Sequence, residues 1–367
     1  MKSQRNGAYA LNQTTGSADA FPKLFSPDDY AGVREYFARC TGYSVTPLRS
    51  LARRARRIGI RELLVKDESA RLGLNSFKML GVSYAIHRLF ADGDLKTNSI
   101  VVCATDGNHG RSLARVARQN QLRSKVYVHI RSSSACRKAI AAEGAEVIVK
   151  GGNYDECVQI AADEAVKNGW VLVSDTSRAG SAKVPKLVMA GYTMLISEAV
   201  TQWREPPNLV LVQAGVGGLA CAVISALIEL YNVNRPLIAS CEPETAACVL
   251  ESIRAGTPVA ARGSLKTIMA GLSCGAVSST AWPTLRFGLD ACIAVADQDC
   301  REALLSLAQP EAGDPQILAG ESGACGAAAL NAILRRREFL PVRDRLGVGP
   351  QTCVLLINTE APTPAEG

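Results

Sequence analysis

The feature that most constrains the fold is a regular alternation of short apolar runs with longer segments whose apolar residues recur at helical spacing. Residues 99–105 are predicted to form a strand, and residues 107–121 a helix. The pattern continues with predicted strands at 125–130, 146–150, 170–175, 208–214, 236–242, 291–296 and 352–358, and predicted helices at 134–144, 154–167, 185–203 and 218–231. Such alternation is typical of parallel sheets covered by helices on both faces.

We therefore predict an α/β protein with two doubly wound, mostly parallel sheets. A length of 367 residues suggests two domains. Polar or Pro-rich joins near 93–98 and 204–208 place a small domain at about 96–204 and a large domain at about 21–95 plus 205–367. The polar residues 1–20 are predicted to be a flexible tail.

Composition narrows the functional classes. The start of the chain has no apolar core of a signal peptide, and no apolar run reaches the roughly 18 residues of a membrane helix, so we expect a cytoplasmic protein without membrane partners. Twelve cysteines include no Cys-x-x-Cys pair and are accompanied by only three histidines, so we predict no metal site. The net charge of +7 is spread along the chain, which does not favour a nucleic-acid partner.

Three motifs suggest a ligand site, and two of them, 106–108 and 215–218, lie at the carboxyl ends of predicted strands, where such folds bind ligands. Lys78 lies in 75–81 (NSFKMLG), a polar turn occupies 104–110 (ATDGNHG), and a glycine-rich turn occupies 215–219 (GVGGL). A helix that begins after Gly217 would aim free N–H groups at an anion. Apolar neighbours such as Phe77 predict a depressed pKa for Lys78, as amine chemistry requires.

Each motif alone has an ordinary interpretation. Lys78 could be a surface lysine, the glycines a tight turn, and Asp106, Asn108 and Asp175 helix caps or turn residues. The glycine turn does not fit Gly-x-Gly-x-x-Gly, which argues against a nicotinamide cofactor. In combination, an amine, a polar turn and backbone donors predict a site for pyridoxal 5'-phosphate (PLP), which needs partners for its aldehyde, ring hydroxyl and phosphate.

From about residue 40 to 360 the chain resembles the fold-type II, tryptophan-synthase-β-like PLP enzymes, and most closely the diaminopropionate ammonia-lyases. Serine and threonine dehydratases tend to carry a serine in the polar turn, where this chain has Thr105 and Asp106. The motifs that carry the resemblance are 66–69 (KDES), 75–78 (NSFK), 104–111 (ATDGNHGR), 175–176 (DT), Pro185, 191–192 (GY), 215–218 (GVGG), 269–275 (MAGLSCG), 321–324 (ESGA) and 358–360 (NTE).

The resemblance implies a homodimer with PLP in the cleft between its domains, and α,β-elimination of D- or L-2,3-diaminopropionate to pyruvate and two ammonia. Lys78 would hold PLP and act on the L-isomer, Asp106 would be the base for the D-isomer, and Asp175 would hold the distal ammonium. The implied cofactor residues are Lys78, Phe77, Asn108 at the ring hydroxyl, Gly215, Val216, Gly217, Gly218 and Leu219 at the phosphate, and Thr359, with Asn358 as second choice, at the pyridine nitrogen. The implied substrate residues are Ser76, Thr105, Asp106, His109, Asp175 and Arg178.

Departures from the family pattern keep other interpretations open. Arg178 stands where the family usually has tryptophan, and Ala361 where it usually has glycine. The alternatives are β-elimination or β-replacement on serine, threonine, 3-hydroxyaspartate or a bulkier substrate, and a PLP-binding protein without turnover. Cys248 and Cys274, which approach the site in this family, could pair as a disulfide or remain two buried thiols.

Overall fold

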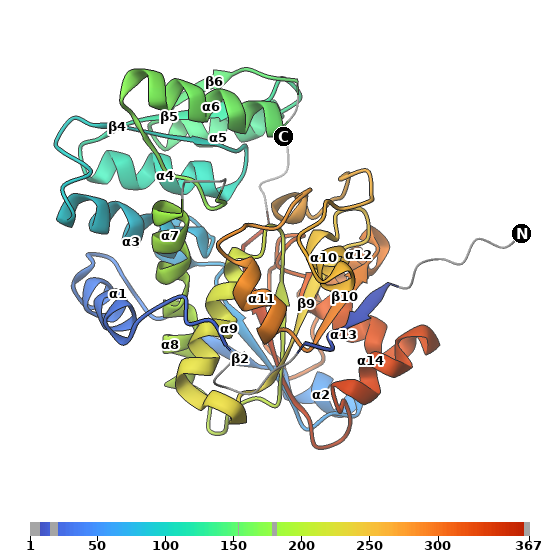
Figure 1. Ribbon diagram of the computed structural model, residues 1–367. Helices are drawn as coiled ribbons and strands as arrows, with labels where there is room; N and C mark the ends of the chain where they lie inside the picture. The colour runs from blue at the N-terminus through green and yellow to red at the C-terminus, as the bar shows by residue number, and fades with distance from the viewer. Residues whose placement is uncertain (1–7, 15–20, 153, 178–181, 363–367) are drawn as a thin grey trace, which may run out of the picture.

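The computed structural model describes residues 8–14, 21–152, 154–177 and 182–362. Figure 1 shows two sheets with helices packed on their faces, which confirms the predicted α/β class. The larger sheet has the order β1-β10-β9-β8-β11-β3-β2, and the smaller β6-β5-β4-β7. The strands are β1 (Tyr9–Leu11), β2 (Leu48–Ser50), β3 (Glu62–Asp67), β4 (Ile100–Ala104), β5 (Arg123–Val128), β6 (Glu146–Val149), β7 (Val171–Leu172), β8 (Leu209–Gln213), β9 (Leu237–Pro243), β10 (Ala291–Val295) and β11 (Cys353–Asn358).

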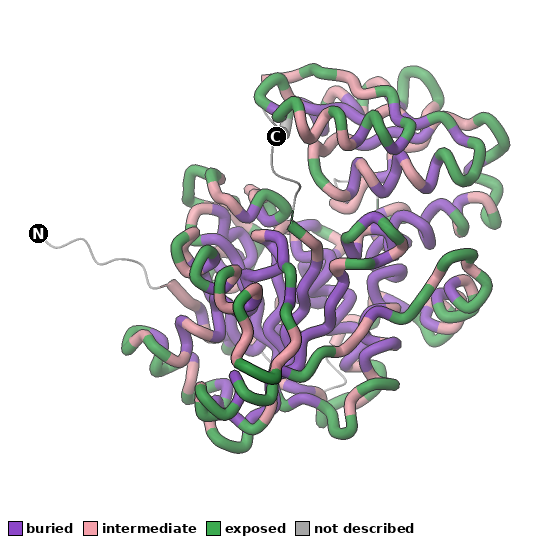
Figure 2. The backbone as a smooth tube through the Cα atoms, turned by 180° about the vertical axis from the view of Figure 1, so that it is seen from behind, coloured by how far each residue is buried: buried purple, intermediate pink, exposed green. Residues whose placement is uncertain are grey.

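All described strand pairs are parallel except those at the two edges of the larger sheet, β1 with β10 and β2 with β3. The inner strands β8, β10 and β11 are buried along their whole lengths. Figure 2 shows this buried centre beneath an exposed outer layer. Continuous apolar runs are therefore the sequence signal of strands covered on both faces.

The helices follow the predicted alternation. No helix among the described residues is long and apolar enough to cross a membrane. The helices are α1 (Pro27–Arg39), α2 (Ala52–Ile58), α3 (Lys78–Ala91), α4 (Asn108–Gln119), α5 (Ser134–Ala142), α6 (Tyr154–Asn168), α7 (Lys183–Tyr192), α8 (Met194–Val200), α9 (Gly218–Tyr231), α10 (Cys248–Ala255), α11 (Trp282–Gly288), α12 (Asp297–Ala308), α13 (Cys325–Arg335) and α14 (Leu340–Arg345), with 3₁₀ turns at Arg71–Gly73, Asn232–Asn234, Ala270–Leu272 and Arg337–Phe339.

Two predictions about these elements were wrong. The single helix expected at 185–203 is divided at Thr193, whose hydroxyl and backbone N–H both bond back to the carbonyl of Ala190 and end α7 there. The tail expected at 1–20 is also not free throughout. Its strand β1 pairs with β10, and the side chain of Asn12 donates to the carbonyls of Arg286 and Leu289, both at 2.7 Å. The sequence did not predict β1, because a strand of three residues is too short to show the alternation of apolar and polar residues.

A fully buried ionic network fixes the chain just before α3. Glu198 of α8 accepts from Lys66 Nζ at 2.5 Å and from both terminal nitrogens of Arg71 at 2.7 Å. Arg71 also forms a two-pronged contact with Glu68, at 2.7 and 2.8 Å. The side chains of these four residues have no exposed surface. The two positive and two negative charges are therefore matched, as burial requires.

Close helix packing positions the start of α3. Gly81 of α3 faces α7, where a Cβ atom would lie 2.4 Å from the ring of Tyr192 and 2.7 Å from the carbonyl of Val188. Gly191 of α7 approaches α3 equally closely, because its Cβ would lie 2.5 Å from the carbonyl of Leu80. The two glycines let the helices touch through their backbones and bring Tyr192 beside Lys78.

Replacing Gly81 by alanine is therefore expected to destabilise the protein by about 1–3 kcal/mol, because the added methyl group overpacks a backbone contact. The measurement is the free energy of unfolding from urea titration. The matched control is Gly349→Ala, where a Cβ meets nothing within 4 Å, so the change should stay within about 0.5 kcal/mol. Equal effects in the two variants would contradict the close packing.

Candidate active site

Lys78, the first residue of α3, meets Asp175, which follows β7. Lys78 Nζ lies 2.5 Å from Asp175 Oδ2. The rings of Phe77 and Tyr192 flank the ammonium, with centroids 5.2 and 5.8 Å from Nζ. The predicted catalytic lysine and acid are thus in direct contact, although 97 positions separate them.

This contact corrects the expected pKa of Lys78. Burial works to lower the pKa of Lys78, but the Asp175 carboxylate outweighs burial and raises that pKa well above its ordinary value. Burial likewise works to raise the pKa of Asp175, but Lys78 and His109 hold it well below its usual range. The predicted depression of the lysine pKa was wrong because apolar neighbours in sequence do not reveal a carboxylate brought in by the fold.

His109 faces the same carboxylate from α4. Its Nε2 lies 2.8 Å from the carbonyl oxygen of Val173, which can only accept, so Nε2 carries the hydrogen. Its buried Nδ1 lies 4.0 Å from Asp175 Oδ2 and has no hydrogen-bond partner among the described residues. Burial lowers the pKa of His109, so the neutral ring directs a proton-accepting nitrogen toward Asp175.

The glycine-rich turn follows β8 and leads into α9. Gly217 has φ 93°, which favours glycine, and a Cβ there would lie 2.4 Å from Leu285. A Cβ on Gly218 would lie 3.7 Å from the carbonyl of Asp175, so the turn adjoins the Lys78–Asp175 pair. Because the turn opens a helix of 14 residues, its N–H groups suit a phosphate.

Hydroxyl groups beside this turn were not predicted. Ser278 donates its N–H to the carbonyl of Val216 at 2.9 Å. The hydroxyl of Ser177 lies 2.9 Å from the hydroxyls of both Ser278 and Ser279. Ser177 is separated from Ser278 by 101 positions, and single serines carry no sequence signal of such a cluster.

The residues that follow β11 also reach the start of α3. The carbonyl of Thr359 accepts from Phe77 N–H at 3.1 Å, and Ser76 forms a bridge with Glu360. Asn358 donates to Asp67 at 2.9 Å and to the carbonyl of Leu318 at 3.3 Å. The amide nitrogen of Asn358 is thus already engaged, which favours Thr359, the first choice, for the pyridine nitrogen.

The remaining predicted residues have other partners. Asp106 lies 3.4 Å from His129 Nε2 with 37% of its side chain exposed, whereas Lys78 pairs with Asp175. Thr105 accepts from the N–H of Gly107 at 3.1 Å. Asn108 donates to Glu360, a residue that the sequence did not single out as functional. Arg178 lies outside the described residues.

Cys248 and Cys274 both approach Gly215 of the glycine turn, and both are free thiols. Cys248 Sγ donates to the carbonyl of Gly215 at 3.3 Å, and a Cβ on Gly215 would lie 2.9 Å from Cys274 Sγ. Burial raises the pKa of Cys274 to about 12, which keeps it protonated at neutral pH. Both cysteines therefore act as packing groups around the turn. Among the described residues no group of three or more His, Cys, Asp or Glu side chains could hold a metal ion.

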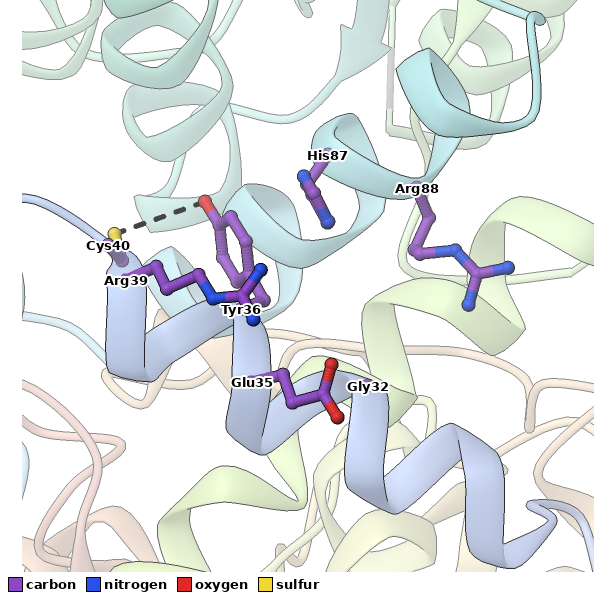
Figure 3. Close-up of a pocket in the computed structure, with 7 residues that line it drawn as sticks. All are labelled: Gly32, Glu35, Tyr36, Arg39, Cys40, His87 and Arg88. Carbon is purple, nitrogen blue, oxygen red and sulfur yellow. Dashed lines mark hydrogen bonds between the residues drawn. The ribbon is translucent and has the colours of Figure 1, made fainter.

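A separate cavity of about 350 Å³ lies between α1 and α3 (Figure 3). There the ring of Tyr36 stacks on His87 at a centroid distance of 4.5 Å. None of the predicted site residues that the structure describes lines this cavity. Its lining residues are Gly32, Glu35, Tyr36, Arg39, Cys40, His87 and Arg88.

Comparisons with known proteins agree with this geometry. The family model described as "Pyridoxal-phosphate dependent enzyme" matches residues 40–348. A diaminopropionate ammonia-lyase of Escherichia coli K12 is 36% identical, over 93% of this chain and 90% of its own length. The E. coli enzyme solved "in complex with aminoacrylate-PLP azomethine reaction intermediate" superposes with a TM-score of 0.90 at 35% identity, covering 97% of this chain and 94% of that one. A serine racemase from Dictyostelium discoideum, at 22% identity and a TM-score of 0.73, covering 92% of this chain and 99% of that one, shares the fold.

Proposed function

The chain belongs to the family of pyridoxal-phosphate dependent enzymes, and from this premise we propose that it is a diaminopropionate ammonia-lyase. It converts D- or L-2,3-diaminopropionate to pyruvate and two ammonia. Similarity to the E. coli enzyme along almost the whole chain supports the reaction. The observation that carries the proposal is the contact between Lys78 and Asp175, because a carboxylate beside the predicted PLP-binding amine suits a substrate that has a second ammonium.

The residues present fit PLP. Lys78 would hold the aldehyde carbon through its amine, Asn108 would bond the ring hydroxyl, and Thr359 would serve the pyridine nitrogen. The backbone N–H groups of the glycine turn, 215–219, would hold the phosphate at the start of α9. When bound, PLP withdraws electrons from the substrate Cα and so acidifies its proton.

Asp175 recognises the distal ammonium of the substrate. A charged Asp175 carboxylate would keep the bound amine protonated. A protonated amine can leave as neutral ammonia, so this contact favours elimination. In its neutral form Lys78 would take the Cα proton of the L-isomer, and Asp106 would serve the opposite face for the D-isomer. Nδ1 of His109 is available to hold a proton beside Asp175.

Asp175→Asn tests the assignment, because asparagine keeps the shape and removes the charge. In the PLP-loaded enzyme, kcat/KM for diaminopropionate should fall roughly 10²-fold or more, as expected for loss of a partly buried charged partner. Any elimination from serine, which has no second ammonium, should fall much less. Pyruvate formation from both substrates is the measurement, and the absorbance of bound PLP is the control for loading. Equal losses for the two substrates would favour another β-substituted amino acid.

One departure favours the second candidate, elimination or replacement on another β-substituted amino acid. In the sequence Arg178 follows Asp175, Thr176 and Ser177, at the position where the resembled family has tryptophan, and a cation at this position would suit an anionic or longer side chain. Assays of keto-acid formation from serine, threonine and 3-hydroxyaspartate distinguish the two candidates. Arg178→Trp should shift the preference toward diaminopropionate if Arg178 sets the second specificity.

We also propose a cytoplasmic homodimer with the domain division 21–95 plus 205–367 and 96–204. All twelve cysteines are free thiols, which suits a reducing compartment. Twofold dimers are the commonest assemblies of soluble enzymes. Light scattering after size-exclusion chromatography measures the assembly, and a monomer mass would contradict the dimer.

A further inference from the structure

Glu360, just beyond β11, reaches the predicted cofactor residue Asn108 at the start of α4. Asn108 Nδ2 donates to Glu360 Oε2 at 2.6 Å. The two residues are 252 positions apart. Asn108 begins α4, which follows β4 of the smaller sheet, and Glu360 follows β11 of the larger sheet. This bond therefore joins the smaller sheet to the larger one at the candidate site.

The partners of Asn108 leave its amide a single orientation. Glu360 supplies an acceptor on one side, so the nitrogen must point there. On the other side Arg111 Nη1 donates to Asn108 Oδ1 at 3.4 Å, so the oxygen must point there. The amide nitrogen carries two hydrogens, and one of them is donated to Glu360 in a hydrogen bond. The second hydrogen remains available for an acceptor such as a ring hydroxyl.

The surroundings of Glu360 are shaped to hold its carboxylate. Ser322 N–H donates to Glu360 Oε1 at 3.3 Å, and the N–H of Gly320 donates to the Glu360 carbonyl at 2.9 Å. A Cβ on Gly320 would lie 2.8 Å from Glu360 Cγ, so only glycine leaves room for this side chain. The bridge with Ser76 fixes the backbone of Glu360 beside the segment that carries Lys78. Burial raises the pKa of Glu360.

We propose that Glu360 is a positioning residue for PLP, which acts by fixing the amide of Asn108 so that one N–H faces the ring hydroxyl. This inference rests on the proposed function, because Asn108 is assigned to PLP there. Glu360 itself touches Asn108 and Ser322, and its effect on the cofactor passes through Asn108. The hydrogen bond between Asn108 and Glu360 also holds the start of α4, which follows β4 of the smaller sheet, near the end of β11.

The test is a double-mutant cycle read out by PLP affinity of the apoenzyme, which requires no turnover. Glu360→Ala alone should weaken PLP binding roughly 10-fold, the size of one hydrogen bond to a charged group. In an Asn108→Ala background the same change should weaken binding less than about 2-fold. Glu338→Ala, at a side chain that is 63% exposed, is the matched control and should leave affinity unchanged.

Glu360→Gln keeps an acceptor oxygen for Asn108 and should recover most of the lost affinity. It also covers the case in which Glu360→Ala does not fold. Losses that multiply in the double variant, or a glutamine variant no better than alanine, would overturn the positioning role. A wild-type protein that fails to bind PLP would instead overturn the proposed function, so the two failures are distinguishable.

Discussion

Lys78→Ala should abolish the covalent attachment of PLP and reduce pyruvate formation on the order of 10³-fold or more. The reason is that holding PLP and taking the Cα proton both require the lysine amine. Removing the ammonium also leaves the partly buried Asp175 carboxylate without its closest partner. The absorbance band of protein-bound PLP should therefore be lost from the dialysed variant. Pyruvate from D- and L-2,3-diaminopropionate provides the second measurement.

Lys186→Ala is the control for this experiment. Lys186 lies on α7 and pairs with Asp29 at 3.4 Å on the surface, with 41% of its side chain exposed. The control variant should keep both the PLP absorbance and the activity. Retention of the PLP band after dialysis of Lys78→Ala would show that another amine holds the cofactor and would refute the assignment of Lys78.

Glu198→Ala should produce the largest loss of stability, about 3–5 kcal/mol, because it leaves Lys66 and Arg71 buried with only Glu68 as a carboxylate partner. The measurement is the free energy of unfolding in urea. The matched control is Glu205→Ala, which removes a contact with Arg61 at 2.7 Å but whose side chain is 69% exposed. Exposed pairs contribute about 1 kcal/mol or less, so the control should change little. Similar values for the two variants would contradict the role of burial.

The effect of Glu198 should also depend on pH. Burial works to raise the pKa of Glu198, but Arg71 and Lys66 lower it below the ordinary 4.5. A carboxylate with a depressed folded-state pKa stabilises the fold above 4.5 and loses that contribution as the pH falls through the folded-state pKa. The difference in stability between wild type and Glu198→Ala should therefore shrink in acid. A difference that grows in acid would contradict the ionic origin.

The sequence was most informative where signals are local. The helix predicted at 218–231 is α9 residue for residue, because a glycine turn and a long apolar segment mark its start and length. The edge strand β1 was not predicted, because three residues are too few to show an alternation of apolar and polar residues. The partners of charged and polar groups were not predicted, because they lie far away in the sequence. The contacts of Lys78 with Asp175 and of Asn108 with Glu360 span 97 and 252 positions, and only the folded chain brings them together.

The place of β11 in the larger sheet has a consequence for biosynthesis. This strand follows all the other described strands in chain order, yet it lies between β8 and β3 and pairs with both. A chain still emerging from the ribosome therefore lacks the middle of its larger sheet until β11 has been made. The residues that follow β11 and contact the start of α3 are made later still, so PLP finds no complete site on a chain that lacks them. A chain truncated before residue 353 would leave one edge of β8 and one edge of β3 without a partner strand, and such edges promote aggregation.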